Sequence, residues 1–210
     1  MSLPVHTLAV IALAGVVVFY AGAAGAAAAE DPDWPCVQRL MPELSPATVW
    51  GGPPVDDAAP AWRDTPAIRD LVLRIASRRT ALEDGEKAVA AFARTLGGEK
   101  DAMLTLVFAG LFTTIDQERS RLLSGIKRYA RGQRRLASRI RQLTADLGAA
   151  PADGTPQSAA RRRQLRERQV WDTRIFEERE RSLQALCEQP VLLEQRLFIL
   201  ARAIMAQMDE

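Results

Sequence analysis

The sequence lacks the residues that most site chemistries require. The 210-residue chain has a single histidine, His6, and only two cysteines. We expect His6 to be removed with the N-terminal segment described below, so that the mature chain has no Ser-His-Asp or Cys-His nucleophile system and no histidine metal ligand. The sequence also has no C-x-x-C motif and no glycine-rich phosphate loop. Carboxylate pairs occur at Asp56-Asp57 and Glu177-Glu178, but neighbours on a helix point in different directions. We expect no enzyme, no cofactor and no metal, with a carboxylate-dependent wall hydrolase as a remote alternative.

Charge is absent from the first 29 residues, which contain no Lys, Arg, Asp or Glu. An apolar stretch from Leu8 to Tyr20 is followed by small residues that end in Ala27-Ala28-Ala29. This pattern predicts a secretory signal peptide over residues 1–29, cleaved before Glu30. The mature protein is then exported, to a periplasm or the exterior. A retained single N-terminal membrane anchor is the alternative, because about 20 apolar residues span a bilayer.

Export changes the interpretation of the two cysteines. In an oxidising compartment an even pair is typical of a disulfide, and only one intrachain pairing exists, Cys36 with Cys187. Two separate thiols are the alternative.

The middle of the chain carries helix signals and no strand signal. Residues 65–98 predict two short helices. The first runs from about 66 to 79 after the Thr65-Pro66 cap, and the second begins at a capping box, Thr80 to Glu83. We expect the second helix to stop at Gly97-Gly98.

Residues 99–147 predict one long helix, because they lack proline and keep a seven-residue apolar repeat. At about 1.5 Å per residue this helix spans roughly 73 Å, longer than a compact core of this chain requires. One seam position is uninterrupted and comprises Phe108, Ile115, Leu122, Tyr129, Leu136 and Leu143. The other comprises Phe112, Ile126, Ile140 and Leu147, with Arg119 and Gln133 interrupting it.

A turn at residues 148–158 predicts that residues 159–210 return as a helix, kinked or broken at Pro190. The facing residues of this hairpin have numbers that sum to roughly 304, so that Tyr129 faces Ile175. Leu193, Leu197, Leu200 and Ile204 form the main apolar stripe of the last segment. We also expect the aromatic residues Tyr129, Trp171 and Phe176 to be core.

Residues 30–64 are rich in proline and tryptophan and cannot form a continuous helix. We interpret them as a strap that covers apolar helix faces, anchored by Trp34 and Trp50 and tied by the disulfide. An exposed Trp-Pro docking motif is the alternative. The predicted fold is all-α: a long antiparallel coiled-coil hairpin on a small helical base, with an irregular Trp/Pro-rich N-terminal strap tied by a disulfide.

Basic residues are segregated along the chain. No acidic residue occurs from Arg119 to Ala145, and this stretch together with Arg161 to Arg168 carries +13, which leaves −11 elsewhere for the net charge of +2. We expect a basic arm that binds a partner. Its members are Lys127, Arg128, Arg131, Arg134, Arg135, Arg139, Arg141, Arg161, Arg162, Arg163 and Arg166. A solvated coiled-coil face is the alternative. Gly125 and Gly132 lie beside the seam. They either allow another helix to approach closely or are surface glycines that the helix tolerates.

These features favour an exported adaptor, scaffold or chaperone whose basic arm binds an anionic or acidic protein partner. A peripheral membrane or cell-wall organiser with its basic tip on an anionic envelope surface is the alternative. Export argues against nucleic acid as the partner. Half-exposed seam residues on a two-helix arm also suggest a homo-oligomer through the coiled coil.

Overall fold

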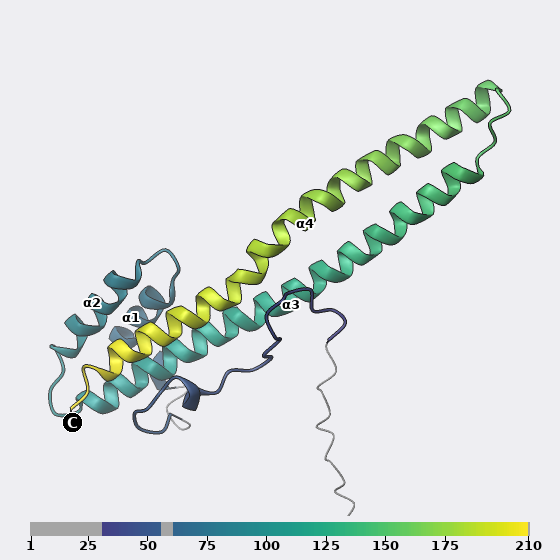
Figure 1. Ribbon diagram of the computed structural model, residues 1–210. Coiled ribbons are helices and arrows are strands. Elements are labelled where there is room, and N and C mark those ends of the chain that lie inside the picture. Colours follow the sequence, from purple (N-terminus) through teal and green to yellow (C-terminus); the bar gives the residue numbers. More distant parts are fainter. Residues whose placement is uncertain (1–30, 56–60, 210) are drawn as a thin grey trace, which may run out of the picture. The chain divides into compact units, whose positions relative to one another are not determined.

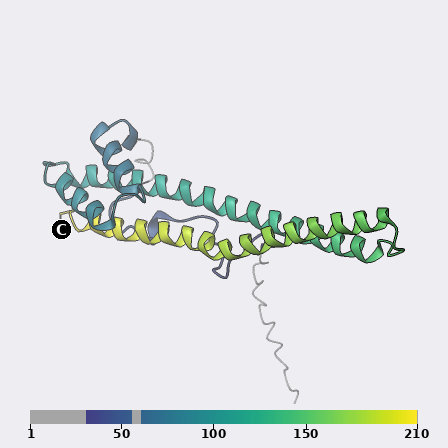
Figure 2. The ribbon, with the colours of Figure 1, turned by 90° about the horizontal axis from the view of Figure 1, so that it is seen from above.

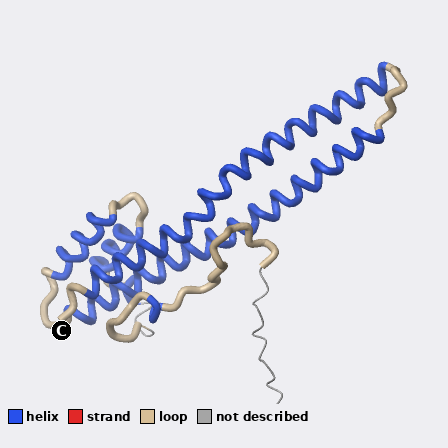
Figure 3. Tube along the Cα trace, in the orientation of Figure 1, coloured by secondary structure: helices blue, strands red, loops and turns tan. Residues whose placement is uncertain are grey.

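The structure, a computed structural model, describes residues 31–55 and 61–209. The described residues form four α-helices and two short 3-10 helices and contain no strand, which confirms the all-α class (Figures 1 and 3). The predicted signal peptide, the retained-anchor alternative and Asp56-Asp57 lie outside these residues. The elements are η1 (Pro46–Thr48), η2 (Ala61–Arg63), α1 (Pro66–Ala76), α2 (Leu82–Ala93), α3 (Lys100–Ala149) and α4 (Pro156–Met205).

The helices α3 and α4 form the predicted hairpin and lie side by side in opposite directions (Figures 1 and 2). Each has 50 residues. The turn ends as the sequence indicates: Pro156 occupies the first turn of α4, and the Thr155 hydroxyl accepts a hydrogen bond from the Ser158 amide. Gly154 has φ +78°, a left-handed conformation that favours glycine. The α4 helix continues through Pro190 to Met205, so no fifth helix begins there.

The side-chain contacts across the hairpin are offset by one to two helical turns from the pairs that the sequence predicts. The Tyr129 hydroxyl donates to the carbonyl of Arg179, one turn beyond Ile175, and Arg139 pairs with Asp172. The reason is that side chains on a helix lean toward its own N-terminus. In an antiparallel pair the two side chains therefore lean in opposite directions. The residues whose side chains touch have higher numbers than the residues whose Cα atoms lie side by side at the same place.

The predicted seven-residue seam is buried only in part. Phe108, Ile115, Leu136 and Leu143 are buried as predicted, whereas Leu122 and Tyr129 are half-buried and their neighbours Leu123 and Ala130 are buried instead. The face of α3 that packs on α4 therefore departs from a strict heptad over residues 122–130.

The base consists of α1 and α2 packed against the N-terminal part of α3 and the C-terminal part of α4 (Figure 1). The predicted stripe of α4 is fully buried there. The capping box at Thr80 is wrong: Ala81 precedes α2, and the Thr80 hydroxyl donates to the carbonyl of Arg74 at the end of α1. The helix α2 also ends at Ala93, before the expected glycine stop, because the chain closes into tight turns through Leu96.

The described part of the strap, residues 31–55 and 61–64, is mostly non-helical (Figure 3). A disulfide joins Cys36 to Cys187, with 5.6 Å between their Cα atoms, which confirms the predicted pairing. Trp50 is buried in the core cluster, whereas Trp34 is half-buried and donates its indole N–H to the carbonyl of Gln38. The strap thus covers the hairpin through Trp50 and is held beside α4 by the disulfide.

Candidate functional site

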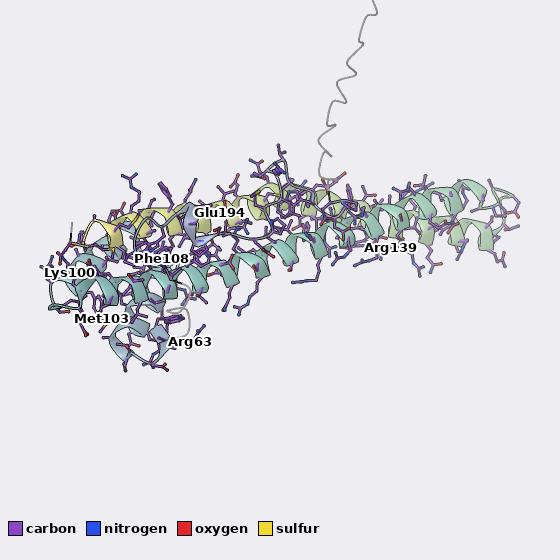
Figure 4. The ribbon with its side chains drawn as sticks, turned by 90° about the horizontal axis from the view of Figure 1, so that it is seen from below. Arg63, Lys100, Met103, Phe108, Arg139 and Glu194 are labelled. Atoms are coloured by element: carbon purple, nitrogen blue, oxygen red, sulfur yellow. A yellow bond between two sulfur atoms is a disulfide. The ribbon has the colours of Figure 1, made fainter. Side chains whose placement is uncertain are left out.

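The basic arm lies on the part of the hairpin farthest from the base. Its members come from the second half of α3 and the first turns of α4, and the antiparallel packing brings these two segments together. In Figure 4, Arg139 marks the arm, and Phe108 and Glu194 mark the part of the hairpin nearer the base. The eleven predicted residues divide into three groups by what they contact.

The first group binds the acidic start of the strap. Lys127 Nζ lies 2.8 Å from Asp31 Oδ2, and Arg131 lies 2.6 Å from Asp33 Oδ2. Arg134 pairs with Asp33 and donates to the carbonyl of Pro32 at 2.8 Å. The hydrogen bond from Lys127 lowers the pKa of Asp31, and that from Arg131 lowers the pKa of Asp33. One part of the arm therefore already holds an acidic segment of the chain itself.

The second group stabilises the hairpin. Arg139 makes a bidentate pair with Asp172 on α4, at 2.5 and 2.7 Å, which lowers the pKa of Asp172 and raises that of Arg139. Arg162 donates to the carbonyls of Leu147 and Ala150 and so satisfies the C-terminal end of α3. Arg141 donates to the Ser138 hydroxyl. Internal contacts account for these three residues.

The third group is exposed and makes no side-chain hydrogen bond or ion pair with the described part of the chain. It consists of Arg128, Arg135, Arg161, Arg163 and Arg166. The guanidinium groups of Arg128 and Arg135 lie over Gly125 and Gly132: a Cβ on either glycine would be 3.8 or 3.9 Å from them. This is ordinary van der Waals distance, so neither glycine is required by a close approach within the described chain.

The expectation that Trp171 belongs to the core is wrong. Trp171 is 63% exposed and its neighbour Val170 is 62% exposed. The residues of α4 that face α3 are instead Gln169, Asp172 and Phe176. They form hydrogen bonds with Thr144, Arg139 and Gln133 of α3, respectively. Residue 171 is about 100° away from residue 172 around the helix, which places it off this inner stripe. Phe176 and Tyr129 are half-buried at the edge of the packed face.

The polar residue that interrupts the seam nearer the base has a role that the sequence did not indicate. Arg119 is 2% exposed, pairs with Glu194 of α4 at 2.5 Å and donates to the strap carbonyls of Met41 and Pro42. It therefore joins α3, α4 and the strap at one point. The second interrupting residue, Gln133, donates to the Phe176 carbonyl and to Glu180 of α4.

Two shallow grooves flank the strap where it meets α4. One, of about 350 Å³, is mainly apolar and lies between Leu44, Val49 and Phe198. The other, of about 430 Å³, lies beside the disulfide and the exposed Val37.

Residues 31–55 and 61–209 contain no group of three or more His, Cys, Asp or Glu side chains placed to hold a metal ion. Within the same ranges no helix has both the length and the apolar content to cross a membrane. Comparison with protein-family models, with curated proteins and with solved structures found no match to this chain. The fold and the contacts of the arm define an all-helical hairpin protein with a disulfide-tied strap.

Proposed function

We propose that this protein is an exported, non-enzymatic interaction protein, an adaptor, scaffold or chaperone, whose basic arm binds an acidic segment of a partner protein. The observation that carries the proposal is the contact between the strap and the arm. Asp31 and Asp33 stand on a tight turn, closed by a hydrogen bond from the Trp34 amide to the Asp31 carbonyl. Their carboxylates lie on Lys127, Arg131 and Arg134. A surface of this kind suits closely spaced carboxylates of a partner chain.

The geometry of this contact suits closely spaced carboxylates. Lys127, Arg131 and Arg134 are spaced four and three residues apart and so lie on one side of α3. Arg134 binds both a carboxylate and a backbone carbonyl, and arginine is well suited to such forked contacts. Arg128 and Arg135, also on α3, are exposed and offer the same chemistry to a second molecule.

Charge segregation supports the same proposal. From Arg119 to Ala145 the chain has no acidic residue and, besides the buried Arg119, eight basic ones. A surface of this charge attracts acidic partners and accelerates encounter. Binding of this kind weakens as salt rises, because the Debye length falls to about 8 Å at 0.15 M. The proposed export, which rests on the apolar N-terminal pattern and the disulfide, directs the arm toward envelope or extracellular proteins.

Fluorescence anisotropy with a labelled peptide of alternating Asp and Glu tests this function. The matched control peptide has Asn and Gln at the same positions. We expect salt-sensitive binding of the acidic peptide only, weakened about tenfold in Arg128→Gln/Arg135→Gln because exposed ion pairs contribute up to about 1 kcal/mol each. The control variant Arg74→Gln/Arg94→Gln removes two exposed arginines of the base and should bind like the parent.

Equal binding of the two peptides, or equal binding by both variants, would contradict the proposal. Flotation with anionic and neutral vesicles distinguishes the lipid alternative. If the protein binds anionic vesicles but not the acidic peptide, the arm recognises a membrane surface instead.

A further inference from the structure

The side of α4 that faces away from α3 has an unusual order of residues. Five positions spaced four, three, four and four residues apart lie on one stripe, and Trp171 flanks its centre. These positions are Arg163, Glu167, Val170, Arg174 and Glu178. All five are exposed, and none forms a side-chain ion pair or hydrogen bond with the described residues. Val170 at the middle of the stripe and the flanking Trp171 are the two most exposed large apolar residues of α4.

The stripe is complementary to itself when it is reversed. A second copy can lie antiparallel so that the Val170 side chain of each chain meets the Trp171 side chain of the other across a two-fold axis. Glu167 then meets Arg174, and Arg163 meets Glu178. Arg166 and Glu177 flank the stripe and also come close to each other across the axis. Every charged position faces the opposite charge, and the apolar pairs meet at the centre.

We infer that this protein forms an antiparallel homodimer through this face of α4. The inference goes beyond the proposed function, because it concerns a contact between two copies of the chain. A two-fold interface uses the same patch on both subunits and therefore requires self-complementarity. The parallel arrangement is excluded by charge, since Arg163 would face Arg163 and Glu178 would face Glu178.

The charges on this face are not explained by contacts within one helix. Arg163 and Glu167, and Arg174 and Glu178, are four residues apart, a spacing that permits ion pairs. Neither pair is formed in the structure. Arg163 and Glu178 are 15 residues apart, about 22 Å along the helix, which exceeds two Debye lengths at physiological salt. Only a second chain brings these two side chains together.

The hairpin does not use this face, because α4 packs on α3 through the opposite side of the helix. Leu165, Gln169, Asp172 and Phe176 each lie two residues beyond a member of the stripe, about 200° around the helix, and they are turned toward α3. The dimer would therefore form without opening the hairpin. Four apolar side chains at its centre make a small interface, so we expect a reversible, concentration-dependent dimer rather than an obligate one.

A charge-swap experiment, read by sedimentation equilibrium between about 5 and about 200 µM chain, tests the dimer. Arg163→Glu alone and Glu178→Arg alone should each raise the dimer dissociation constant at least about tenfold, because like charges then face each other. The double variant Arg163→Glu/Glu178→Arg should restore it to within about threefold, since the interaction between the chains is re-formed. A monomeric parent over the whole range overturns the inference, and so does a double variant no better than the single ones.

Cross-linking measures the register independently of stability. A cysteine introduced by Val170→Cys lies next to the two-fold axis and should form a disulfide-linked dimer on mild oxidation, with the native disulfide unchanged. Leu73→Cys places an equally exposed cysteine on α1 and is the matched control. Equal yields from the two positions would show random collision and overturn the proposed axis. Circular dichroism of each variant verifies that the helices are intact.

Discussion

The indole of Trp50 stacks on the ring of Phe108, with centroids 4.1 Å apart and planes inclined by 6°. This contact joins the strap to α3 at the centre of the base, where both side chains are buried. Offset stacking of this kind adds to the stabilisation from apolar burial. The strap is therefore part of the core and not a loose tail.

Trp50→Ala should lower the free energy of unfolding by about 3 kcal/mol or more, because it removes a buried aromatic side chain and leaves a cavity. Urea unfolding followed by circular dichroism measures the loss. Trp34→Ala is the control, since Trp34 is only half-buried and bonds within the strap. A loss for Trp34→Ala as large as that for Trp50→Ala would mean that stacking on Phe108 is not what anchors the strap.

Cys36→Ser should lower stability while α3 and α4 remain helical. The disulfide closes a separation of 151 residues, for which loop-closure entropy predicts a contribution of up to about 5 kcal/mol. Far-UV circular dichroism should be nearly unchanged, and the urea midpoint should fall. Adding a dithiol reductant to the parent should lower its urea midpoint to that of the variant. An unchanged midpoint in Cys36→Ser would show that the disulfide-tied strap does not stabilise the fold.

Arg119→Lys should destabilise the protein by about 3 kcal/mol, although it keeps the charge. Lysine cannot bind Glu194 and the carbonyls of Met41 and Pro42 together, and the site is almost fully buried. Arg121→Lys, an exposed neighbour, serves as the control and should change stability by less than about 0.5 kcal/mol. Equal effects of the two changes in chemical denaturation would show that the three-way contact does not stabilise the fold.

Gly110→Ala should be destabilising by about 1 to 3 kcal/mol despite the higher helix propensity of alanine. A Cβ at this position would lie 2.8 Å from Trp62 and 2.8 Å from Val72. Gly125→Ala has no such contact and should stabilise by about 1 kcal/mol. Thermal unfolding of the two variants should therefore shift in opposite directions, and a shared direction would exclude close packing as the reason for Gly110.

Acid should release the start of the strap from the arm. The pKa values of Asp31 and Asp33 are lowered in the folded protein, so these ion pairs contribute stability above the unfolded pKa of about 4 and lose it as pH falls through the lower folded values. Unfolding experiments should show Asp33→Asn less stable than the parent at neutral pH and equal to it in acid. At about 0.5 M NaCl the neutral-pH difference should also shrink. A difference that is independent of pH and salt would exclude the ion pairs as its cause.

Much of the fold follows from local sequence patterns. The absence of proline between residues 99 and 147, the Thr155-Pro156 cap and the apolar repeat predicted two long helices within a few residues of their bounds. The two cysteines allowed one intrachain pairing, and it is formed. The pairs of side chains that meet across the hairpin were not predictable in the same way, because they depend on how far each side chain leans along its helix.

The sequence by itself determined the helical hairpin, the disulfide and the segregation of charge, since periodicity, capping residues and composition act locally. Only the tertiary structure decided which charges have partners. It placed Asp31 and Asp33 on Lys127, Arg131 and Arg134, buried Arg119 under the strap and left Trp171 exposed. These outcomes depend on contacts between residues about 75 to 100 positions apart and on a rotation of about 100° per residue around α4. Composition and periodicity alone determine neither the long-range contacts nor the side of α4 on which each residue lies.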